Sequence, residues 1–128
     1  MIVIDNENSL QDQGVWTEFA GSKFKIAHAG NMLFQRTLNR LQLPHRRQIE
    51  RGNIDPAISH DILCKAIAKG LLLDWKDVVK SDGTQVPYCE DFGAQALKNN
   101  TDLREYIQEF ASDLENYRIE RIHTEGNS

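Results

Sequence analysis

The fold is decided by residues 55–75, which read DPAISHDILCKAIAKGLLLDW. Asp55 followed by Pro56 predicts the start of a helix, because an acidic side chain caps free backbone N–H groups and proline is tolerated at the first helical position. Apolar side chains then recur at helical spacing as far as Trp75, which predicts one central, buried helix. They are Ile58, Ile62, Leu63, Ala66, Ile67, Leu71 and Leu72. Gly70 predicts close packing of another backbone or a bend, because glycine weakens a helix interior.

A β-hairpin is predicted near the N-terminus. Residues 15–19 and 24–28 each approximate an alternation of apolar and polar side chains, and residues 20–23 between them include a glycine that tolerates a turn. One face of this hairpin is then buried. By strict alternation Trp16 falls on the face opposite Val15, so either a bulge intervenes or both faces are covered.

A helix interrupted by proline is predicted between the hairpin and residue 55. Asn31 is a suitable N-cap, and the apolar side chains that follow at spacings of four and three share one side of the helix. These are Phe34, Leu38 and Leu41. Pro44 ends or kinks this helix, residues 45–51 form another turn or two, and Gly52 stops them.

The second half of the chain predicts a short hairpin and two helices. Residues 78–80 and 85–88 flank an Asp82-Gly83 turn, and Pro87 marks the second arm as short or as an edge. A helix is predicted over residues 90–99, and the last helix begins at Thr101. Its apolar stripe comprises Leu103, Ile107, Phe110, Leu114 and Tyr117. Such a stripe packs into the core of its own domain or forms a seam with a partner helix.

The fold class is therefore α+β, mainly α: a small helical domain with an N-terminal β-hairpin and a second short hairpin between helices. The chain has 128 residues, of which 40% are hydrophobic, which suits one globular domain. We expect a flexible lead-in at residues 1–13, this domain at residues 14–120 and a flexible tail at residues 121–128. No apolar run is long enough to span a bilayer and the start lacks the pattern of a signal peptide, so we expect a soluble, unexported protein.

Charge is unevenly distributed along the chain, whose net charge is −4. Residues 36–51 contain five arginines against one acid, whereas residues 101–120 contain six acids against two bases. The two patches could meet within the fold or between subunits, or each could be a solvated helix face. The overall charge disfavours general nucleic-acid binding. Since no aromatic residues are interleaved with the arginines, contact within the protein or with an acidic protein surface is favoured for them.

The sequence carries no complete motif for catalysis, metals or cofactors. It lacks a phosphate-binding loop and a nucleophile elbow. His60 and Cys64 lie one helical turn apart, but no second pair completes a four-coordinate metal site. Cys89 has no feature that marks it as activated, and we expect both cysteines to be reduced. The acidic row on the last helix, Glu105, Glu109 and Asp113, is typical of a solvated face. We therefore expect no enzymatic activity, no metal and no cofactor.

The order of several segments resembles the small tail assembly chaperones of long-tailed bacteriophages and prophages. The Gly-Val-Trp start at residue 14, the Trp-x-x-Val stretch from Trp75 and Val86-Pro87-Tyr88 are the most specific parts of the resemblance. The other segments that carry it are residues 34–36, 44–49, 72–78 and 102–107. It covers roughly residues 14–115. The amide-rich start and the tail after Ile119 depart from the family pattern.

The resemblance implies a non-enzymatic assembly factor of the bacterial host cytoplasm that is absent from the mature virion. Such proteins bind the tape measure protein, prevent its aggregation and help to recruit tail tube subunits. Self-association is also possible. We expect the partner surface to include Arg46, Arg47, Arg51, Leu103, Ile107, Phe110 and Leu114. The alternatives are a structural tail-completion or connector protein of the virion, and a nucleic-acid-binding regulator that uses residues 36–51.

Overall fold

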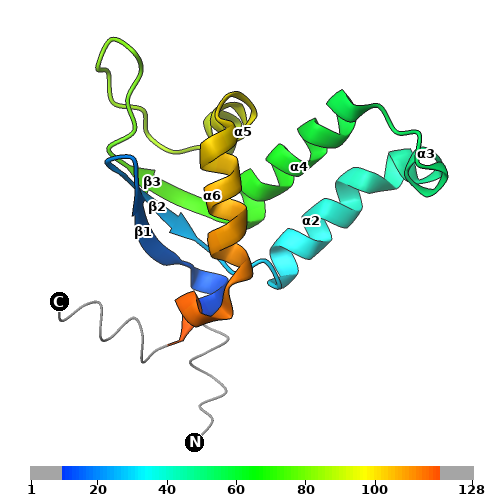
Figure 1. The fold of residues 1–128 in the computed structure, drawn as a ribbon, viewed down its shortest axis with the longest axis horizontal. Coiled ribbons are helices and arrows are strands. Elements are labelled where there is room, and N and C mark those ends of the chain that lie inside the picture. The colour runs from blue at the N-terminus through cyan, green and yellow to red at the C-terminus, as the bar shows by residue number, and fades with distance from the viewer. Residues whose placement is uncertain (1–9, 119–128) are drawn as a thin grey trace, which may run out of the picture.

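The computed structural model describes residues 10–118, and these form a body with a projecting arm (Figure 1). The body is a three-stranded antiparallel sheet with helices α5 and α6 beside it. The arm is formed by helices α2 and α4, with α3 at its far end. The predicted mainly helical α+β class is confirmed. No helix within residues 10–118 is long and apolar enough to cross a membrane.

The predicted N-terminal hairpin is present as β1 (Val15–Phe19) and β2 (Ser22–Ile26). Its turn is tighter than predicted, because Ala20 and Gly21 alone form it, both with positive φ, as this class of two-residue hairpin turn requires. The register is unbroken from Val15 paired with Ile26 to Phe19 paired with Ser22, so no bulge intervenes. Trp16 lies on the outer face, 39% exposed, where the Lys76 ammonium is 4.5 Å from its ring centroid.

The prediction that the central helix continues to Trp75 is wrong. Helix α4 (Pro56–Gly70) ends at Gly70, and residues Leu72–Lys76 form strand β3, which pairs with β2. The same apolar run suits a helix or a strand, and the free edge of β2 decides between them. As a strand, the segment buries Leu72 and Trp75 on the inner face of the sheet. The indole Nε1 of Trp75 also donates to the Val86 carbonyl at 2.7 Å.

The second hairpin is confirmed as a turn with little strand structure. Val79 and Gln85 form an isolated antiparallel bridge, and the Val86 N–H donates to the Val78 carbonyl at 2.8 Å. Gly83 has a φ of +87°, as the predicted Asp-Gly turn requires. Pro87, which has no N–H to donate, follows directly and limits the second arm.

The helices of the arm follow the predicted signals. Helix α2 (Met32–Gln42) begins at the Asn31 N-cap, and the short 3-10 helix η1 (Leu43–His45) contains Pro44. Helix α3 (Arg46–Arg51) ends where Gly52 adopts a left-handed conformation with φ +70°. Helix α4 then starts with the predicted cap, in which the Asp55 carboxylate accepts a hydrogen bond from the Ala57 N–H at 2.9 Å.

The last helix is shorter than predicted. Helix α5 (Glu90–Asn99) matches its prediction, but α6 (Thr101–Ser112) ends before Leu114, and residues Leu114–Tyr117 form a 3-10 helix, η2. Asp113 is extended, and its carboxylate accepts from the Glu115 N–H at 3.0 Å, a local bond that competes with helix continuation. The predicted stripe is thus divided: Tyr117 is 1% exposed, whereas Leu114 is 50% exposed.

The core lies where α4, the sheet and the last two helices meet. Its fully buried apolar side chains come from every one of these elements: Ile26, Cys64, Ile67, Leu72, Leu97 and Ile107. Residues 10–13, part of the predicted lead-in, form a helical turn whose Gln11 carbonyl accepts from the His28 N–H at 2.9 Å. The remainder of the predicted lead-in and the tail after residue 118 lie outside the described residues.

Candidate protein-interaction surface

The base of the arm is fixed by one buried side chain, that of Asn31. Its Oδ1 accepts a hydrogen bond from the Phe34 N–H at 2.9 Å, which caps α2. Its Nδ2 donates to the carbonyls of His28 at 2.6 Å and Gly70 at 2.9 Å. If the buried Asn31 amide lost these three hydrogen bonds, its polar atoms would be left unsatisfied and the fold would be destabilised. Asn31 therefore holds the start of α2 against the end of α4.

Gly70 allows the two arm helices to touch at their backbones. A Cβ atom placed on Gly70 would overlap the Cα of Phe34 and lie 2.8 Å from its N, closer than real Cβ atoms approach other atoms. The close packing of another backbone that the sequence predicted at Gly70 is confirmed. The base of the arm is consequently rigid, and the two helices run from it to the far end that carries α3 (Figure 1).

The far end of the arm, residues 43–51, is hereafter the tip. The three arginines of α3, which are Arg46, Arg47 and Arg51, are all exposed. Two aliphatic side chains are exposed beside them, Leu43 by 59% and Ile49 by 37%. Together with Arg46 these line a hollow of about 170 Å³ between η1 and α3. The tip therefore combines positive charge with exposed apolar surface. Exposed apolar surface rimmed by polar residues is typical of a protein-binding site.

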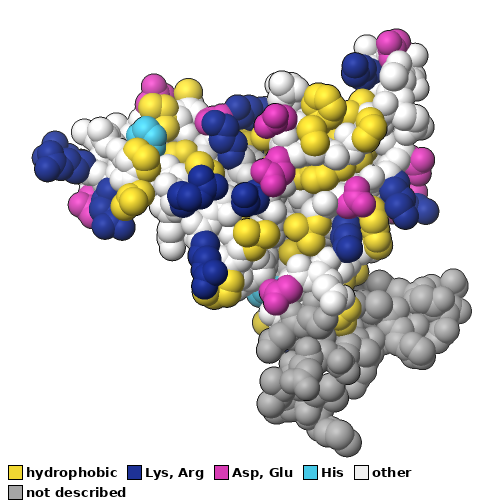
Figure 2. Space-filling view, turned by 180° about the vertical axis from the view of Figure 1, so that it is seen from behind, with side chains coloured by type: hydrophobic (Ala, Val, Ile, Leu, Met, Phe, Trp, Pro, Cys, Tyr) yellow, Lys and Arg dark blue, Asp and Glu magenta, His cyan; other side chains and the backbone are white. Residues whose placement is uncertain are grey.

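The arm and the body carry opposite charge. Residues 32–70 hold seven Lys and Arg against three Asp and Glu, whereas the other described residues hold seven against twelve. Figure 2, which shows the molecule from behind, has Lys and Arg side chains spread over the half that contains the arm. Within residues 10–118 the ion pairs are Lys65–Asp61, Lys98–Asp61 and Arg118–Glu115. None of these pairs involves an arginine of the tip.

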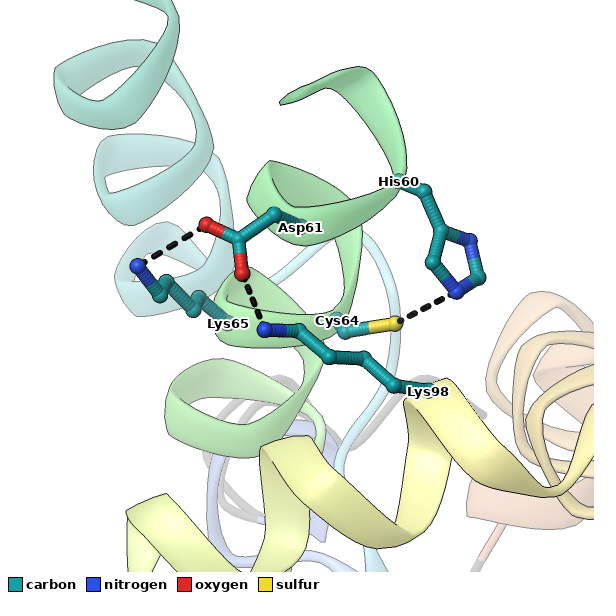
Figure 3. A network of polar contacts seen from close by, with 5 residues as sticks. All are labelled: His60, Asp61, Cys64, Lys65 and Lys98. Carbon is teal, nitrogen blue, oxygen red and sulfur yellow. Dashed lines mark hydrogen bonds and ion pairs between the residues drawn. The ribbon is translucent and has the colours of Figure 1, made fainter. Parts of the chain in front are cut away.

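A groove of about 400 Å³ lies between α2, α4 and α5 and is lined by residues of all three helices. Asp61 on α4 lies beside it and pairs with Lys65, at 2.8 Å, and with Lys98 of α5 (Figure 3). Hydrogen bonds from these two ammonium groups hold the pKa of the Asp61 carboxyl below its ordinary value. Two of the four cations that line the groove, Lys65 and Lys98, are therefore paired within the chain, and Asp61 joins α5 to the arm.

His60 and Cys64, the pair considered as metal ligands, do come together on α4. The His60 Nε2 and the Cys64 Sγ are 3.7 Å apart (Figure 3). Within residues 10–118, however, no group of three or more His, Cys, Asp or Glu side chains could hold a metal ion. Burial raises the pKa of the Cys64 thiol, which disfavours the reactive thiolate. This pair therefore packs the face of α4 that meets α5 and α6.

Comparison with protein families gives a match over residues 29–127 to the model of the YdaY prophage protein family. The chain belongs to the YdaY prophage protein family. The matched segment includes the whole arm together with α5 and α6. Searches of curated proteins and of solved structures give no match.

This YdaY family member exposes some of the predicted partner-binding residues and buries others. Arg46, Arg47 and Arg51 are exposed together at the tip, as described above. On α6, Leu103 is 9% exposed and Ile107 is fully buried, so in this structure both belong to the core. Phe110 is partly buried against Tyr106 and Tyr117, whereas Leu114 is exposed. The two groups lie on separate elements, with the tip remote from α6 (Figure 1).

The sequence pattern did not single out the exposed aliphatic residues of the tip in this family member. Apart from Leu43, Pro44 and Ile49, the segment from residue 43 to residue 51 is polar or charged. The isolation of these apolar residues in a polar segment was the signal that could have indicated their exposure. Ile58, predicted to lie in the core stripe of α4, is 38% exposed because the first turns of α4 extend past the body toward the tip. The arm thus presents apolar side chains from four of its segments: η1, α3, the start of α4 and the start of α2, where Met32 and Leu33 are exposed.

Proposed function

We propose that this prophage protein is a non-catalytic tail assembly chaperone that binds the tape measure protein. In this proposal it keeps apolar segments of that protein from aggregating and helps to recruit tail tube subunits. It acts in the cytoplasm of the bacterial host and is absent from the mature virion. The observation that carries the proposal is the tip, where exposed Leu43 and Ile49 lie among three exposed arginines.

The tip has the properties that a client-binding surface needs. Apolar side chains supply most of the binding free energy when a partner covers them, and flanking arginines supply orientation and specificity. Because Leu43 and Ile49 are already exposed, binding requires no rearrangement of the core. The rigid base formed by Asn31 and Gly70 holds the tip away from the body. Membership of a prophage protein family supports a role in phage biology.

The test is co-expression of the chain with the tape measure protein encoded by the same prophage. We expect the tape measure protein to be insoluble alone and to form a soluble complex with the chain, seen by pull-down and by size-exclusion chromatography with light scattering. A tape measure protein that is soluble alone, or one that forms no complex, contradicts the proposal. Recovery of the chain from purified particles would favour a structural virion component instead.

A matched pair of variants locates the client surface. Leu43→Asp with Ile49→Asp places two charges on the apolar tip, and we expect this variant to lose the soluble complex. Val79→Asp introduces a charge at a residue that is 51% exposed, comparable with Leu43, but belongs to the body. We expect Val79→Asp to retain the complex. Equal loss, or equal retention, in both variants would remove the tip from the proposal, provided that circular dichroism shows both to be folded.

A further inference from the structure

We infer that the tip of one copy of this chain binds the exposed face of α6 on a second copy. The α6 face consists of Asp102, Glu105 and Glu109 of α6, the C-cap residue Asp113, and Leu114 at the start of η2. All five residues are exposed, and the opposite side of α6 is buried in the core through Ile107 and Ala111. This inference concerns the chain alone and goes beyond the proposed binding of a client, which competes with this contact because both use the tip.

The two surfaces are complementary in charge and in apolar content. The tip offers three arginines with exposed Leu43 and Ile49, while the α6 face offers four carboxylates beside Leu114, which is 50% exposed. No ion pair among the described residues engages these four carboxylates or these three arginines. Leu114 can lie against Leu43 and Ile49, which line a hollow of about 170 Å³ together with Asn39, Gln42, Arg46 and Glu50.

The spacing of the charges also matches. Arg47 and Arg51 are four residues apart on α3, and Glu105 and Glu109 are four residues apart on α6. Four residues of α-helix rise about 6 Å, so two helices lying side by side can form two ion pairs at once. Arginine and carboxylate can make paired, parallel hydrogen bonds, which adds directional specificity to each contact.

These surfaces pair between copies because they are far apart within one copy. The tip stands at the far end of the arm, and α6 lies against the sheet (Figure 1). Asn31 and the backbone contact at Gly70 prevent the arm from folding back. Because the tip and the α6 face are different patches, each association leaves one of each free. Such a head-to-tail contact builds a ring or an open chain of copies.

The first test measures the mass of the chain alone by sedimentation velocity and light scattering. At about 50 mM NaCl we expect species heavier than the 14.7 kDa monomer. At about 500 mM NaCl we expect the apparent dissociation constant to rise at least about tenfold, because screening weakens contacts between exposed charges. A monomer at low salt and high concentration would overturn the inference, even if the same protein bound a tape measure protein or DNA.

Charge reversal provides the decisive test. Arg47→Glu with Arg51→Glu, and separately Glu105→Lys with Glu109→Lys, should each abolish self-association. Mixed together, the two variants should associate, because one keeps the native α6 face and the other the native tip. The variant that carries all four substitutions should regain self-association alone. Failure of both the mixture and the fourfold variant to associate would contradict the pairing of these two surfaces.

Two controls keep this result interpretable. Lys23→Glu with Lys80→Glu changes the net charge by the same amount as the tip reversal but at exposed positions of the body, and it should self-associate as the native chain does. Circular dichroism should show native helix content in every variant, since all the positions are exposed. If a reversal variant is unfolded, the neutral pair Arg47→Gln and Arg51→Gln replaces it, and native self-association of that folded pair would overturn the inference.

Discussion

The body and the outer half of the arm are held in place by different kinds of contact. In the body, side chains join segments that are distant in sequence: the Tyr117 hydroxyl donates to the Ile26 carbonyl at 3.1 Å, and the Thr17 and Tyr106 hydroxyls are 2.5 Å apart. Around the tip, the hydrogen bonds are local, such as that from the Asn53 N–H to the Gln48 carbonyl at 2.9 Å. The body is specified by long-range packing, and the tip by turn and capping residues.

This difference separates the residues that determine stability from those available for binding. Substitutions in the body remove contacts that define the fold, and we expect them to reduce the free energy of unfolding. Substitutions at the tip remove side chains that face solvent, and we expect them to alter association while leaving stability nearly unchanged. The following predictions test this division, beginning with the largest expected effect.

Replacing the same residue type in the two regions gives the sharpest contrast. Ile107 is fully buried, and Ile107→Ala should lower the free energy of unfolding by about 3 kcal/mol through lost burial and a residual cavity. Ile49 is 37% exposed at the tip, and Ile49→Ala should change it by less than about 0.5 kcal/mol. Urea denaturation measures both. Similar losses in the two variants would show that the tip is part of the cooperative core.

The junction of the two regions should tolerate little change. Gly70→Ala places a methyl group against the backbone of Phe34, so α2 must move and the Asn31 bond to the Gly70 carbonyl is strained. We expect a loss of about 2 kcal/mol in the free energy of unfolding, measured by urea denaturation. Lys69→Ala, one residue earlier in the same helix, is the control. A Gly70→Ala variant as stable as this control would refute the close backbone contact.

The Tyr117 hydroxyl joins η2 to β2 through its hydrogen bond to the Ile26 carbonyl. Tyr117→Phe keeps the ring packed against His28 and Phe110 but removes the bond to the buried Ile26 carbonyl. We expect a loss of about 1.5 kcal/mol in the free energy of unfolding, the usual effect of leaving a buried group unsatisfied. Thermal unfolding followed by circular dichroism is the measurement. No change would indicate that water replaces the hydroxyl and that the η2 segment is held by packing alone.

The smallest predicted effect is a loss of stability on acidification, from His28 of the body. Burial lowers the pKa of His28 below its ordinary value of 6.5, and its Nδ1 accepts a hydrogen bond from the Gly30 N–H at 3.1 Å. The unfolded chain therefore binds this proton at a higher pH than the folded chain does, so stability falls as the pH drops through 6.5.

Thermal unfolding at about pH 7.5 and about pH 5.5 measures this dependence. We expect His28→Gln to reduce the loss between the two values, and the same substitution at His45, in the tip, is the matched comparison. An identical loss in the native chain and in His28→Gln would assign the pH dependence to other groups.

Local signals predicted the arm well because its structure is governed by local chemistry. Asn31 and Asp55 cap their helices, Pro44 and Gly52 break the segment between them, and each effect depends on neighbours within a few residues. For Gly70 the sequence predicted close packing or a bend, and the structure shows close packing, although at the end of α4 and not inside a helix that continues to Trp75. The order of helices in the mainly helical fold followed from these signals.

The body was predicted less well because distant residues decide it. Leu72–Lys76 is a strand because β2 offers a free edge some fifty residues earlier in the chain, which periodicity does not reveal. The burial of Tyr117 is also a long-range feature, because its hydroxyl reaches the carbonyl of Ile26 at a sequence separation of 91. The same limit applies to the predicted partner surface. Leu103 and Leu114 share a predicted helical stripe, but α6 ends before Leu114, and only Leu103 is buried.

The arm continues directly into the sheet, because α4 is followed at once by β3. Only Leu71 separates the end of α4 from the start of β3, and its carbonyl accepts from the Ala27 N–H at 2.8 Å. Helix α4 has 15 residues and is therefore about 22 Å long, so it carries the tip well away from the sheet. A partner bound at the tip is therefore connected to the sheet through one continuous segment, which runs along α4 into β3, where Trp75 is buried.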